Sequence, residues 1–408
     1  MDINLSRMLE RFNTLARFGA TERGGLSRLA LSDADKEARD QFVSWLIEAG
    51  LAVRVDDAGN IYGRREGTNS VAPAVLMGSH LDTVYKGGRF DGVIGVLGAF
   101  EVVETLNDYG VQTRAPLELV VFTNEEGARF QPALLGSGLI TGYFTRDFVY
   151  SRRDQDGKTF GEELERIGYK GKEENRPGPL EAYLELHVEQ GPVLEAEGLS
   201  VGVVEGIQGM VWLKVTIWGD ADHAGPTPME MRRDSMVAAA RIISRVRELS
   251  YQLGKGTVTT VGHLCLEPNI VNVIPGKTVF TIDMRNPRDE IIEQGISAVK
   301  EIIARICENE KVSYMIDELW RVGATSFDLR VVQTVEDSVR ERGYSYKRMI
   351  SGAGHDAQYM ARVTPVGMIF VPSIGGKSHT EEEAAPWDDI ERGVNVLLTS
   401  ALKLAGID

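Results

Sequence analysis

The chain has 408 residues, a formal net charge of −15 and two cysteines. Its length suffices for two domains with separate cores, and its 43% hydrophobic and 26% charged residues are ordinary for a globular protein. The acidic balance argues against nucleic acid and anionic membranes as partners, because both attract basic surfaces. Two cysteines are too few for a disulfide framework, which indicates a reducing compartment. Residues 1–15 lack the apolar segment of a signal peptide, and no apolar run approaches the ~20 residues of a membrane span. We therefore expect a cytoplasmic protein.

The first half of the chain alternates between helical and strand-like patterns. Apolar periodicity predicts helices at residues 2–18, 32–49 and 92–109 and strands at 74–77, 117–122, 182–188 and 199–204. Ser32 is a suitable N-cap and Gly50 a suitable stop for the second helix. This alternation is typical of an α/β sheet flanked by helices, in which functional residues gather at the carboxyl ends of strands.

The pattern changes over residues 211–325. Strands are predicted at 211–218, 257–267, 277–284 and 312–319, with helices at 233–253 and 291–309. The order β-α-β-β-α-β is that of a ferredoxin-like unit. Helix–strand alternation then resumes at 329–342, 365–372 and 388–405. We therefore predict a larger domain of residues 1–210 and 326–408, into which a small domain of residues 211–325 is inserted.

Five of the six histidines lie in short motifs that are rich in acidic residues. They are His80, His187, His223, His355 and His379. Imidazole and carboxylate together form the usual ligand set for zinc and related divalent metals. His263 lies in an ordinary strand pattern without a close acidic neighbour, and we leave it out. The histidine motifs therefore predict a metal site.

The first histidine motif combines His80 with two aspartates. His80 and Asp82 are two residues apart at the end of a strand, so both side chains point to one face. This spacing suits a metal-binding imidazole that is oriented by a neighbouring carboxylate. Asp91 begins the following helix and could simply cap it. Its place eleven residues after His80 favours a metal-bridging role instead.

Two adjacent glutamates follow the strand at 117–122. Neighbouring residues on an extended chain face opposite ways. Glu126 and Glu125 can therefore have different roles. One can bind metal while the other acts as a general base beside a metal-bound water. A solvated acidic pair is the alternative, but the position directly after an apolar strand favours chemistry. By contrast, we predict that residues 381–383, three consecutive glutamates, form a solvated run.

In their order along the chain, these motifs resemble the di-metal aminoacylase/carboxypeptidase superfamily. His187 stands in His-Val-Glu-Gln-Gly, where peptidase members usually place an acidic residue. This difference, with the segments at 225–229 and 352–356, resembles the hydantoinase/carbamoylase branch, and most closely its N-carbamoyl-L-amino acid hydrolases.

The resemblance implies two divalent metal ions: zinc, manganese, cobalt or nickel. One would lie between His80 and His187 and the other between Glu126 and His379, with Asp91 bridging both. Such a pair clamps a hydroxide nucleophile.

The resemblance also assigns the catalytic groups. Glu125 would be the general base, and Asp82, the carboxylate expected to orient His80, is also predicted among the catalytic residues. His223 would stabilise the oxyanion in the active site of a partner subunit, which implies a homodimer formed through the inserted domain.

A small-molecule carboxylate is the implied substrate. Asn272 and Arg285 would hold its carboxylate, and Gln190, Gln208 and His355 are lesser contacts. Without the resemblance, Arg285 would be interpreted as a surface ion-pair residue and Asn272 as a turn former.

The implied reaction is hydrolysis of the carbamoyl C–N bond of N-carbamoyl-L-amino acids. Allantoate and N-carbamoyl-β-alanine are alternative substrates within the branch. An aminopeptidase or N-acyl-amino-acid deacylase and a non-catalytic ligand-binding protein remain as further alternatives, although His187 argues against the former and the intact Glu125 against the latter.

Overall fold

A computed structural model describes residues 1–407 of the chain. These residues form two compact units, of which unit 1 consists of Met1–Glu205 and Ser326–Asp408 and unit 2 of Gly206–Thr325. The inserted unit thus starts at residue 206, five residues before the predicted boundary at 211, and it ends at the predicted residue.

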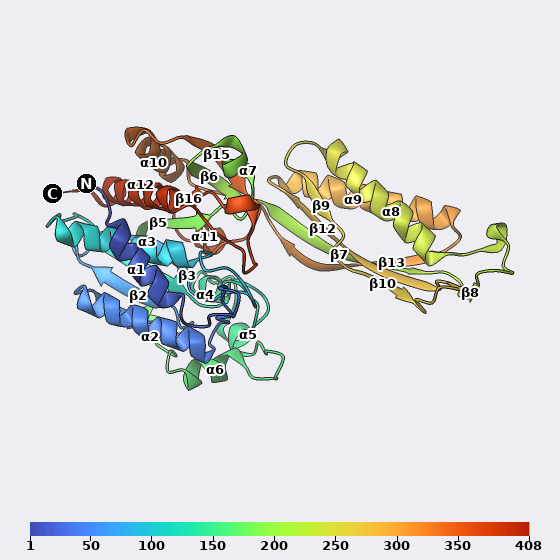
Figure 1. The fold of residues 1–408 in the computed structure, drawn as a ribbon, viewed down its shortest axis with the longest axis horizontal. Helices are drawn as coiled ribbons and strands as arrows, with labels where there is room; N and C mark the ends of the chain where they lie inside the picture. Colours follow the sequence, from blue (N-terminus) through green and yellow to red (C-terminus); the bar gives the residue numbers. More distant parts are fainter. Residues whose placement is uncertain (408) are drawn as a thin grey trace. The chain divides into compact units, whose positions relative to one another are not determined.

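Unit 1 is built on a nine-stranded mixed sheet with the order β1-β2-β4-β3-β5-β16-β6-β14, in which β15 also pairs with β6 (Figure 1). Its strands are β1 (Ala52–Val55), β2 (Ile61–Arg65), β3 (Ala74–His80), β4 (Leu117–Phe122), β5 (Leu180–Val188), β6 (Val201–Ile207), β14 (Thr325–Ser326), β15 (Tyr346–Ser351) and β16 (Val366–Val371). The four central strands β4, β3, β5 and β16 are parallel to one another. Because their carboxyl ends share one edge of the sheet, residues far apart in the sequence meet there.

Long helices cover one face of this sheet. The helices of unit 1 are α1 (Leu5–Leu15), α2 (Asp33–Glu48), α3 (Val93–Asp108), α4 (Leu135–Ile140), α5 (Arg146–Tyr150), α6 (Phe160–Arg166), α7 (Val193–Glu197), α10 (Leu329–Glu341), α11 (Asp356–Met360) and α12 (Trp387–Ala405). Both α3 and α12 pack on β3 and β5, and they also contact each other. Gly95 on α3 lies so close to β5 that a Cβ there would overlap the carbonyl oxygen of Leu186.

The other face of β5 carries the polar residues. Leu186 points toward α3 and α12, so its neighbours Glu185 and His187 face the opposite side. There α11 donates the backbone N–H of Ala357 to Glu185. The alternation of β5 therefore places an apolar contact behind the strand and a histidine in front of it.

Unit 2 contains a five-stranded sheet and two long helices. Its elements are β7 (Gly209–Trp218), β8 (Asp222–His223), α8 (Ser235–Leu253), β9 (Val258–Thr260), β10 (Leu264–Glu267), β11 (Val273–Ile274), β12 (Lys277–Asn286), α9 (Asp289–Asn309) and β13 (Ser313–Val322). The strand order is β10-β12-β7-β13, β9 also pairs with β12, and all of these pairs are antiparallel. The short strands β8 and β11 form a separate ribbon.

The sheet of unit 2 buries one face. Along β12 every second residue is buried, and the apolar ones, Phe280, Ile282 and Met284, join the apolar sides of α8 and α9 in one core. Asp234 caps α8 by accepting from the backbone N–H groups of Met236 and Val237. The prediction of a single strand at residues 257–267 was wrong, because the chain pairs with β12 as two separate strands, β9 and β10.

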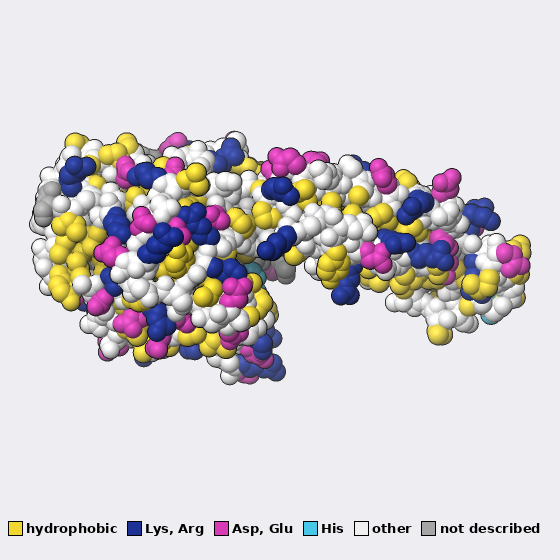
Figure 2. Space-filling model, turned by 90° about the horizontal axis from the view of Figure 1, so that it is seen from above, with side chains coloured by type: hydrophobic (Ala, Val, Ile, Leu, Met, Phe, Trp, Pro, Cys, Tyr) yellow, Lys and Arg dark blue, Asp and Glu magenta, His cyan; other side chains and the backbone are white. Residues whose placement is uncertain are grey.

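The surface carries charges of both signs. Figure 2 shows Lys and Arg side chains interspersed with Asp and Glu over the face that it draws. Both cysteines are free, Cys265 at the surface and Cys307 in the core of unit 2. Within the described part of the chain, no helix combines the length and the apolar character that a membrane crossing requires.

Candidate di-metal centre

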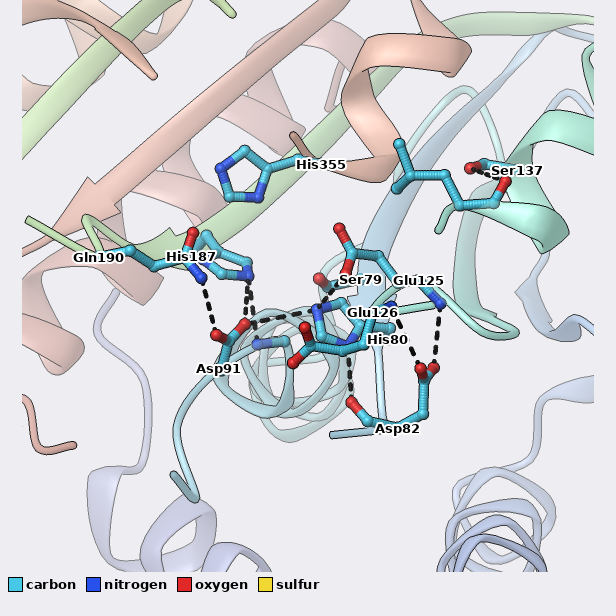
Figure 3. A network of polar contacts seen from close by, with 12 residues as sticks. Ser79, His80, Asp82, Asp91, Glu125, Glu126, Ser137, His187, Gln190 and His355 are labelled. Carbon is cyan, nitrogen blue, oxygen red and sulfur yellow. Dashed lines mark hydrogen bonds and ion pairs between the residues drawn. The ribbon is translucent and has the colours of Figure 1, made fainter. Parts of the chain in front are cut away.

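The five predicted metal ligands meet at the carboxyl edge of the parallel strands of unit 1. Figure 3 labels four of them, His80, Asp91, Glu126 and His187. His80 is the last residue of β3, and His187 lies next to the end of β5. Glu126 follows β4, and His379 lies in the segment after β16. Asp91 directly precedes the residue that caps α3. Strand topology therefore explains how ligands spread over 300 residues of sequence come together.

Asp91 lies between two groups of ligands. Its Oδ1 is 3.0 Å from Nε2 of His187 and 3.5 Å from Nε2 of His80. Its Oδ2 is 3.4 Å from Nε2 of His379, and that nitrogen is 3.3 Å from Oε2 of Glu126. Each carboxylate oxygen of Asp91 thus faces a different group, as a bridging ligand requires.

The histidine tautomers suit metal binding. Nδ1 of His80 lies 2.9 Å from the backbone carbonyl oxygen of Asp82, and Nδ1 of His187 lies 3.0 Å from that of Val188. A carbonyl oxygen can only accept, so Nδ1 carries the proton and Nε2 is left with a lone pair. Nε2 of His80 is buried and has no hydrogen-bond partner among the described residues. Two imidazoles held in this way, with carboxylates around them, fit divalent metal ions.

Asp82 plays a different part from the one expected. Its backbone carbonyl, not its carboxylate, contacts the His80 ring. The carboxylate instead accepts from the backbone N–H groups of Glu125 and Glu126, each at 3.3 Å. Those two residues lie in a turn beyond β4 that begins at Asn124, whose φ is 58°. The expectation of an extended chain there was wrong. The two hydrogen bonds to Asp82 hold the turn in place.

Glu125 lies beside these two ligand groups but belongs to neither of them. Its Oε2 lies 3.6 Å from Nε2 of His80, and the residue is almost completely buried. Burial raises the pKa of Glu125 well above its usual value, the His80 charge opposes this, and the carboxylates of Asp356, Glu126 and Asp91 raise it further. Such a carboxyl group readily accepts a proton beside the metal ligands.

In the absence of metal, several of the candidate ligands hold protons because their pKa values are raised. Burial disfavours the charged form of His80, but the carboxylates of Glu125, Asp91 and Asp82 raise its pKa well above the usual value. A hydrogen bond to Asp91 raises the pKa of His379 to about 9. Burial and the Asp91 charge raise the pKa of Glu126 to about 8. A divalent ion would supply the positive charge that these protons provide in its absence.

Two predicted substrate contacts lie at the same edge. Gln190, which has a φ of 57°, donates from Nε2 to Oδ2 of Asp91 at 2.8 Å. His355 is buried, with its ring centroid 4.5 Å from that of His187. Its Nε2 lies 3.0 Å from Oγ of Ser351, and burial together with the neighbouring His187 keeps its pKa well below the usual value. Both residues therefore border the ligand groups.

The remaining predicted residues belong to unit 2. His223 ends β8 and pairs with Val273, and the backbone N–H of Ala224 donates to Asn272, so His223 and Asn272 are neighbours on the exposed ribbon. Arg285 lies on β12, where it forms a 2.8 Å ion pair with Asp283. Gln208 lies between β6 and β7, and its buried side-chain oxygen has no hydrogen-bond partner among the described residues. The structure brings His223 and Asn272 together but leaves Arg285 elsewhere on the unit.

Three buried acidic residues near the centre escaped the sequence analysis. Glu185 accepts from Oγ of Ser79 at 2.8 Å, and burial raises the pKa values of Glu185 and Asp356. Glu383 is buried as well, so the prediction that residues 381–383 form a solvated run was wrong at its last position. Glu185 had a signal, because a glutamate two residues before His187 in an apolar strand shares its face. No sequence signal distinguishes Glu383 from the two glutamates before it, which are not buried.

A mixed α/β sheet that presents two histidine–carboxylate groups around one shared aspartate, with a buried glutamate beside them, defines the class of di-metal hydrolases. Residues 76–403 match the peptidase family M20/M25/M40, and the chain belongs to this family of di-metal hydrolases.

Comparison with individual relatives shows which group of the family the chain resembles. The chain is 42% identical to an N-carbamoyl-L-amino-acid amidohydrolase of Rhizobium meliloti, over 99% of this chain and 97% of the relative. It is 37% identical to an allantoate amidohydrolase of Escherichia coli, over 96% of each. A crystal structure of a hydantoinase/carbamoylase family amidase from Burkholderia multivorans matches with a TM-score of 0.96 and 44% identity, over 99% of this chain and 98% of that one. Within the larger family, this protein is thus a hydrolase of the hydantoinase/carbamoylase group.

Proposed function

We propose that the protein hydrolyses the carbamoyl C–N bond of N-carbamoyl-L-amino acids and releases the L-amino acid, ammonia and carbon dioxide. The observation that carries this proposal is the Asp91-bridged pair of ligand groups with Glu125 beside it. A ureido carbonyl is a poor electrophile because both nitrogens donate into it, so its hydrolysis needs strong activation. The similarity to N-carbamoyl-L-amino-acid amidohydrolases points to this substrate class.

In this proposal the two ligand groups hold zinc, manganese, cobalt or nickel ions, which suit imidazole and carboxylate ligands. When bound, such ions polarise a carbonyl oxygen and lower the pKa of a water molecule. Glu125 takes the proton of the attacking water and later passes it to the leaving nitrogen. Asp82 contributes by holding the turn that carries Glu125.

His223 has the right tautomer to stabilise an oxyanion. Its Nδ1 accepts from the backbone N–H of Gly225 at 3.1 Å. In the neutral ring Nε2 therefore carries the proton. That N–H would donate to the carbonyl oxygen of the substrate as negative charge develops there.

The layout of unit 2 supports a homodimer in which the partner supplies part of the site. Arg285 lies opposite Val258 of β9 in the antiparallel sheet. By contrast, His223 and Asn272 lie at the β8–β11 ribbon at the other end of the unit (Figure 1). From Lys277, the first residue of β12, to Arg285 there are eight residue steps, which is about 27 Å of extended strand. An amino-acid-sized substrate cannot contact both ends in one chain. We therefore assign Arg285 and the pair His223/Asn272 to different subunits around each substrate carboxylate.

A second candidate is hydrolysis of allantoate, which the similarity to allantoate amidohydrolases favours. It uses the same centre and differs only in the substrate. N-Carbamoyl-β-alanine is a third member of this substrate class. His187, in place of the acidic ligand usual in peptidases, argues against a dipeptide or an N-acyl-amino acid.

The deciding experiment measures ammonia and amine release by metal-reconstituted protein on a matched panel. The panel contains N-carbamoyl-L-methionine, its D-enantiomer, N-acetyl-L-methionine, a methionine dipeptide, N-carbamoyl-β-alanine and allantoate. Fast L-selective release from the first compound, lost with a chelator, is the expected result. Preference for allantoate or the β-alanine derivative would change the substrate but keep the mechanism. Preference for the dipeptide would contradict the proposal.

A further inference from the structure

The most unusual group near the centre is a buried carboxylate that is not among the five ligands. Glu383 is only 4% exposed, although it ends a run of three glutamates. Its neighbour Glu382 is exposed and pairs with Lys377. Burying a carboxylate costs several kcal/mol unless hydrogen bonds compensate it. The contacts of Glu383 therefore indicate why it is buried.

Glu383 contacts both sides of the second ligand group, which consists of Asp91, Glu126 and His379. Its Oε1 accepts from the backbone N–H groups of Phe90 and Asp91, each at 3.0 Å. Its Oε2 lies 2.9 Å from the hydroxyl of Ser378. That hydroxyl is also 3.2 Å from Oδ2 of Asp91, and Ser378 directly precedes His379 in the chain. One side chain thus joins the backbone of the bridging aspartate to the segment that carries a histidine ligand.

The segment with His379 is held at several points, including hydrogen bonds from Gly375 to Glu195 and from Thr21 to Glu381. It forms a loop of residues 374–384, which is closed at its base by the hydrogen bond from Ile374 N–H to the carbonyl oxygen of Ala384. His379 itself has a φ of 55°, a left-handed conformation that costs a non-glycine residue free energy. Surrounding contacts must hold such a residue in place. Glu383 adds the contacts that join this loop to the backbone of Phe90 and Asp91.

The neighbouring chain is shaped to admit this carboxylate. Gly88 lies three residues before Asp91, and the atoms nearest to a Cβ at that position would be those of the Glu383 side chain, which it would overlap. A glycine here keeps the space in which the Glu383 carboxylate reaches the two N–H groups.

We propose that Glu383 is a positioning residue that fixes Asp91 and the 374–384 loop relative to each other, so that Asp91, Glu126 and His379 form one metal site. This inference rests on the di-metal centre of the proposed function. His80 and His187 lie in strands β3 and β5, so the other site depends less on Glu383. Loss of the Glu383 contacts weakens binding of one ion of the two.

The test compares stepwise Co²⁺ binding by wild type, Glu383→Ala, Glu383→Gln and the exposed control Glu382→Ala, using chelator competition and visible absorption. Glu383→Ala should weaken one ion by about 10- to 100-fold, the usual effect of losing a partner behind a metal ligand, while the other changes much less. Glu383→Gln should restore binding, because its carbonyl oxygen accepts from both N–H groups and its amide donates to Ser378. Glu382→Ala should match wild type.

Gly88→Ala provides an independent variant, because it displaces the carboxylate while Glu383 remains. It should weaken the same ion, even if Glu383→Ala does not fold. Unchanged Co²⁺ affinities in folded Glu383→Ala, or a Gln variant as impaired as the Ala variant, would overturn the positioning role. Wild-type protein that takes up fewer than two ions would instead contradict the di-metal centre itself.

Discussion

At the scale of single residues, three of the candidate ligands are held by hydrogen bonds to the surrounding chain. His80 and His187 are fixed through Nδ1 by backbone carbonyl groups. Oδ2 of Asp91 accepts from Nε2 of Gln190. Such contacts set the tautomer and orientation of a ligand before an ion binds. The centre is therefore largely organised by the protein itself.

Glu125 should be needed for turnover and not for metal binding. Replacing it with Gln removes the proton acceptor but keeps the shape, and neither ligand group contains it. We expect kcat to fall by about 10²- to 10⁴-fold, the range for loss of a general base, with two ions per chain retained. Metal analysis of purified Glu125→Gln beside its activity measures both effects.

Glu126→Gln is the matched control, because Glu126 lies in the second ligand group. It should lose affinity for one ion. If Glu125→Gln loses metal instead, Glu125 is a ligand and the two glutamates have exchanged roles.

Metal uptake should release protons. The pKa of His379 is raised to about 9 by its hydrogen bond to Asp91, so in metal-free protein this ring is protonated below pH 9. An ion must displace that proton, and its affinity should therefore fall as the pH falls, by about tenfold per pH unit for each proton displaced. Calorimetric titrations at pH 7 in buffers of different ionisation enthalpy count the protons. Uptake without proton release at pH 7 would show that His379 is not a ligand.

At the scale of elements, the site depends on how closely α3 packs on β5. Gly95 allows the helix to approach the backbone of Leu186, the residue before His187. The apolar side of β5 is thereby fixed against α3 and α12, while the opposite side presents Glu185 and His187. A shift of α3 would move Asp91 relative to His187, since Asp91 lies just before the start of this helix.

Gly95→Ala should destabilise the protein although alanine is the better helix former. Alanine favours an isolated helix by about 1 kcal/mol, but the new Cβ overlaps a backbone oxygen that cannot move aside alone. Overpacking of this kind costs about 1–3 kcal/mol, so the melting temperature should fall. Gly178→Ala is the control, because its Cβ would meet no atom within 4 Å. A melting temperature that rises in Gly95→Ala would refute the close packing.

Long helices and fully buried strands could be predicted from sequence, whereas short strands that are only partly apolar or partly buried could not. The helix expected at 32–49 is α2, with Ser32 as its N-cap as predicted. The helix expected at 92–109 is α3. By contrast, β1, β2 and β15 were missed, because these strands of four to six residues are only partly apolar or partly buried. Their position depends on pairing with distant strands, which local patterns do not encode.

At the scale of the whole molecule, the proposed residues of unit 2 divide between its two ends. Arg285 lies beside β9, while His223 and Asn272 lie on the β8–β11 ribbon. In a twofold dimer each subunit can offer one end to its own site and the other end to that of its partner. Variants at the two ends should therefore complement each other.

Arg285→Ala and His223→Ala should each be nearly inactive alone and regain activity when mixed. In a mixed dimer, one of the two sites receives an intact Arg285 from one chain and an intact His223 from the other. After random exchange of subunits the activity should reach about a quarter of the wild-type value. Unfolding and refolding the two variants together, followed by an activity assay, measures this. Absence of any recovery, with dimers present, would place both residues in one chain.

The sequence by itself determined which residues are candidates for the chemistry. The five candidate ligands and the separate glutamate were predicted from histidine and acidic motifs and the family resemblance that these motifs carry, and the inserted unit from a change in the pattern of helices and strands. Only the tertiary structure decided which atoms meet. It showed that the backbone carbonyl of Asp82 orients His80, that its carboxylate fixes the Glu125–Glu126 turn, and that Glu383 is buried while its neighbours are not. Such contacts join segments up to about 300 residues apart, and hydrogen bonds of that kind leave no periodic pattern in the sequence.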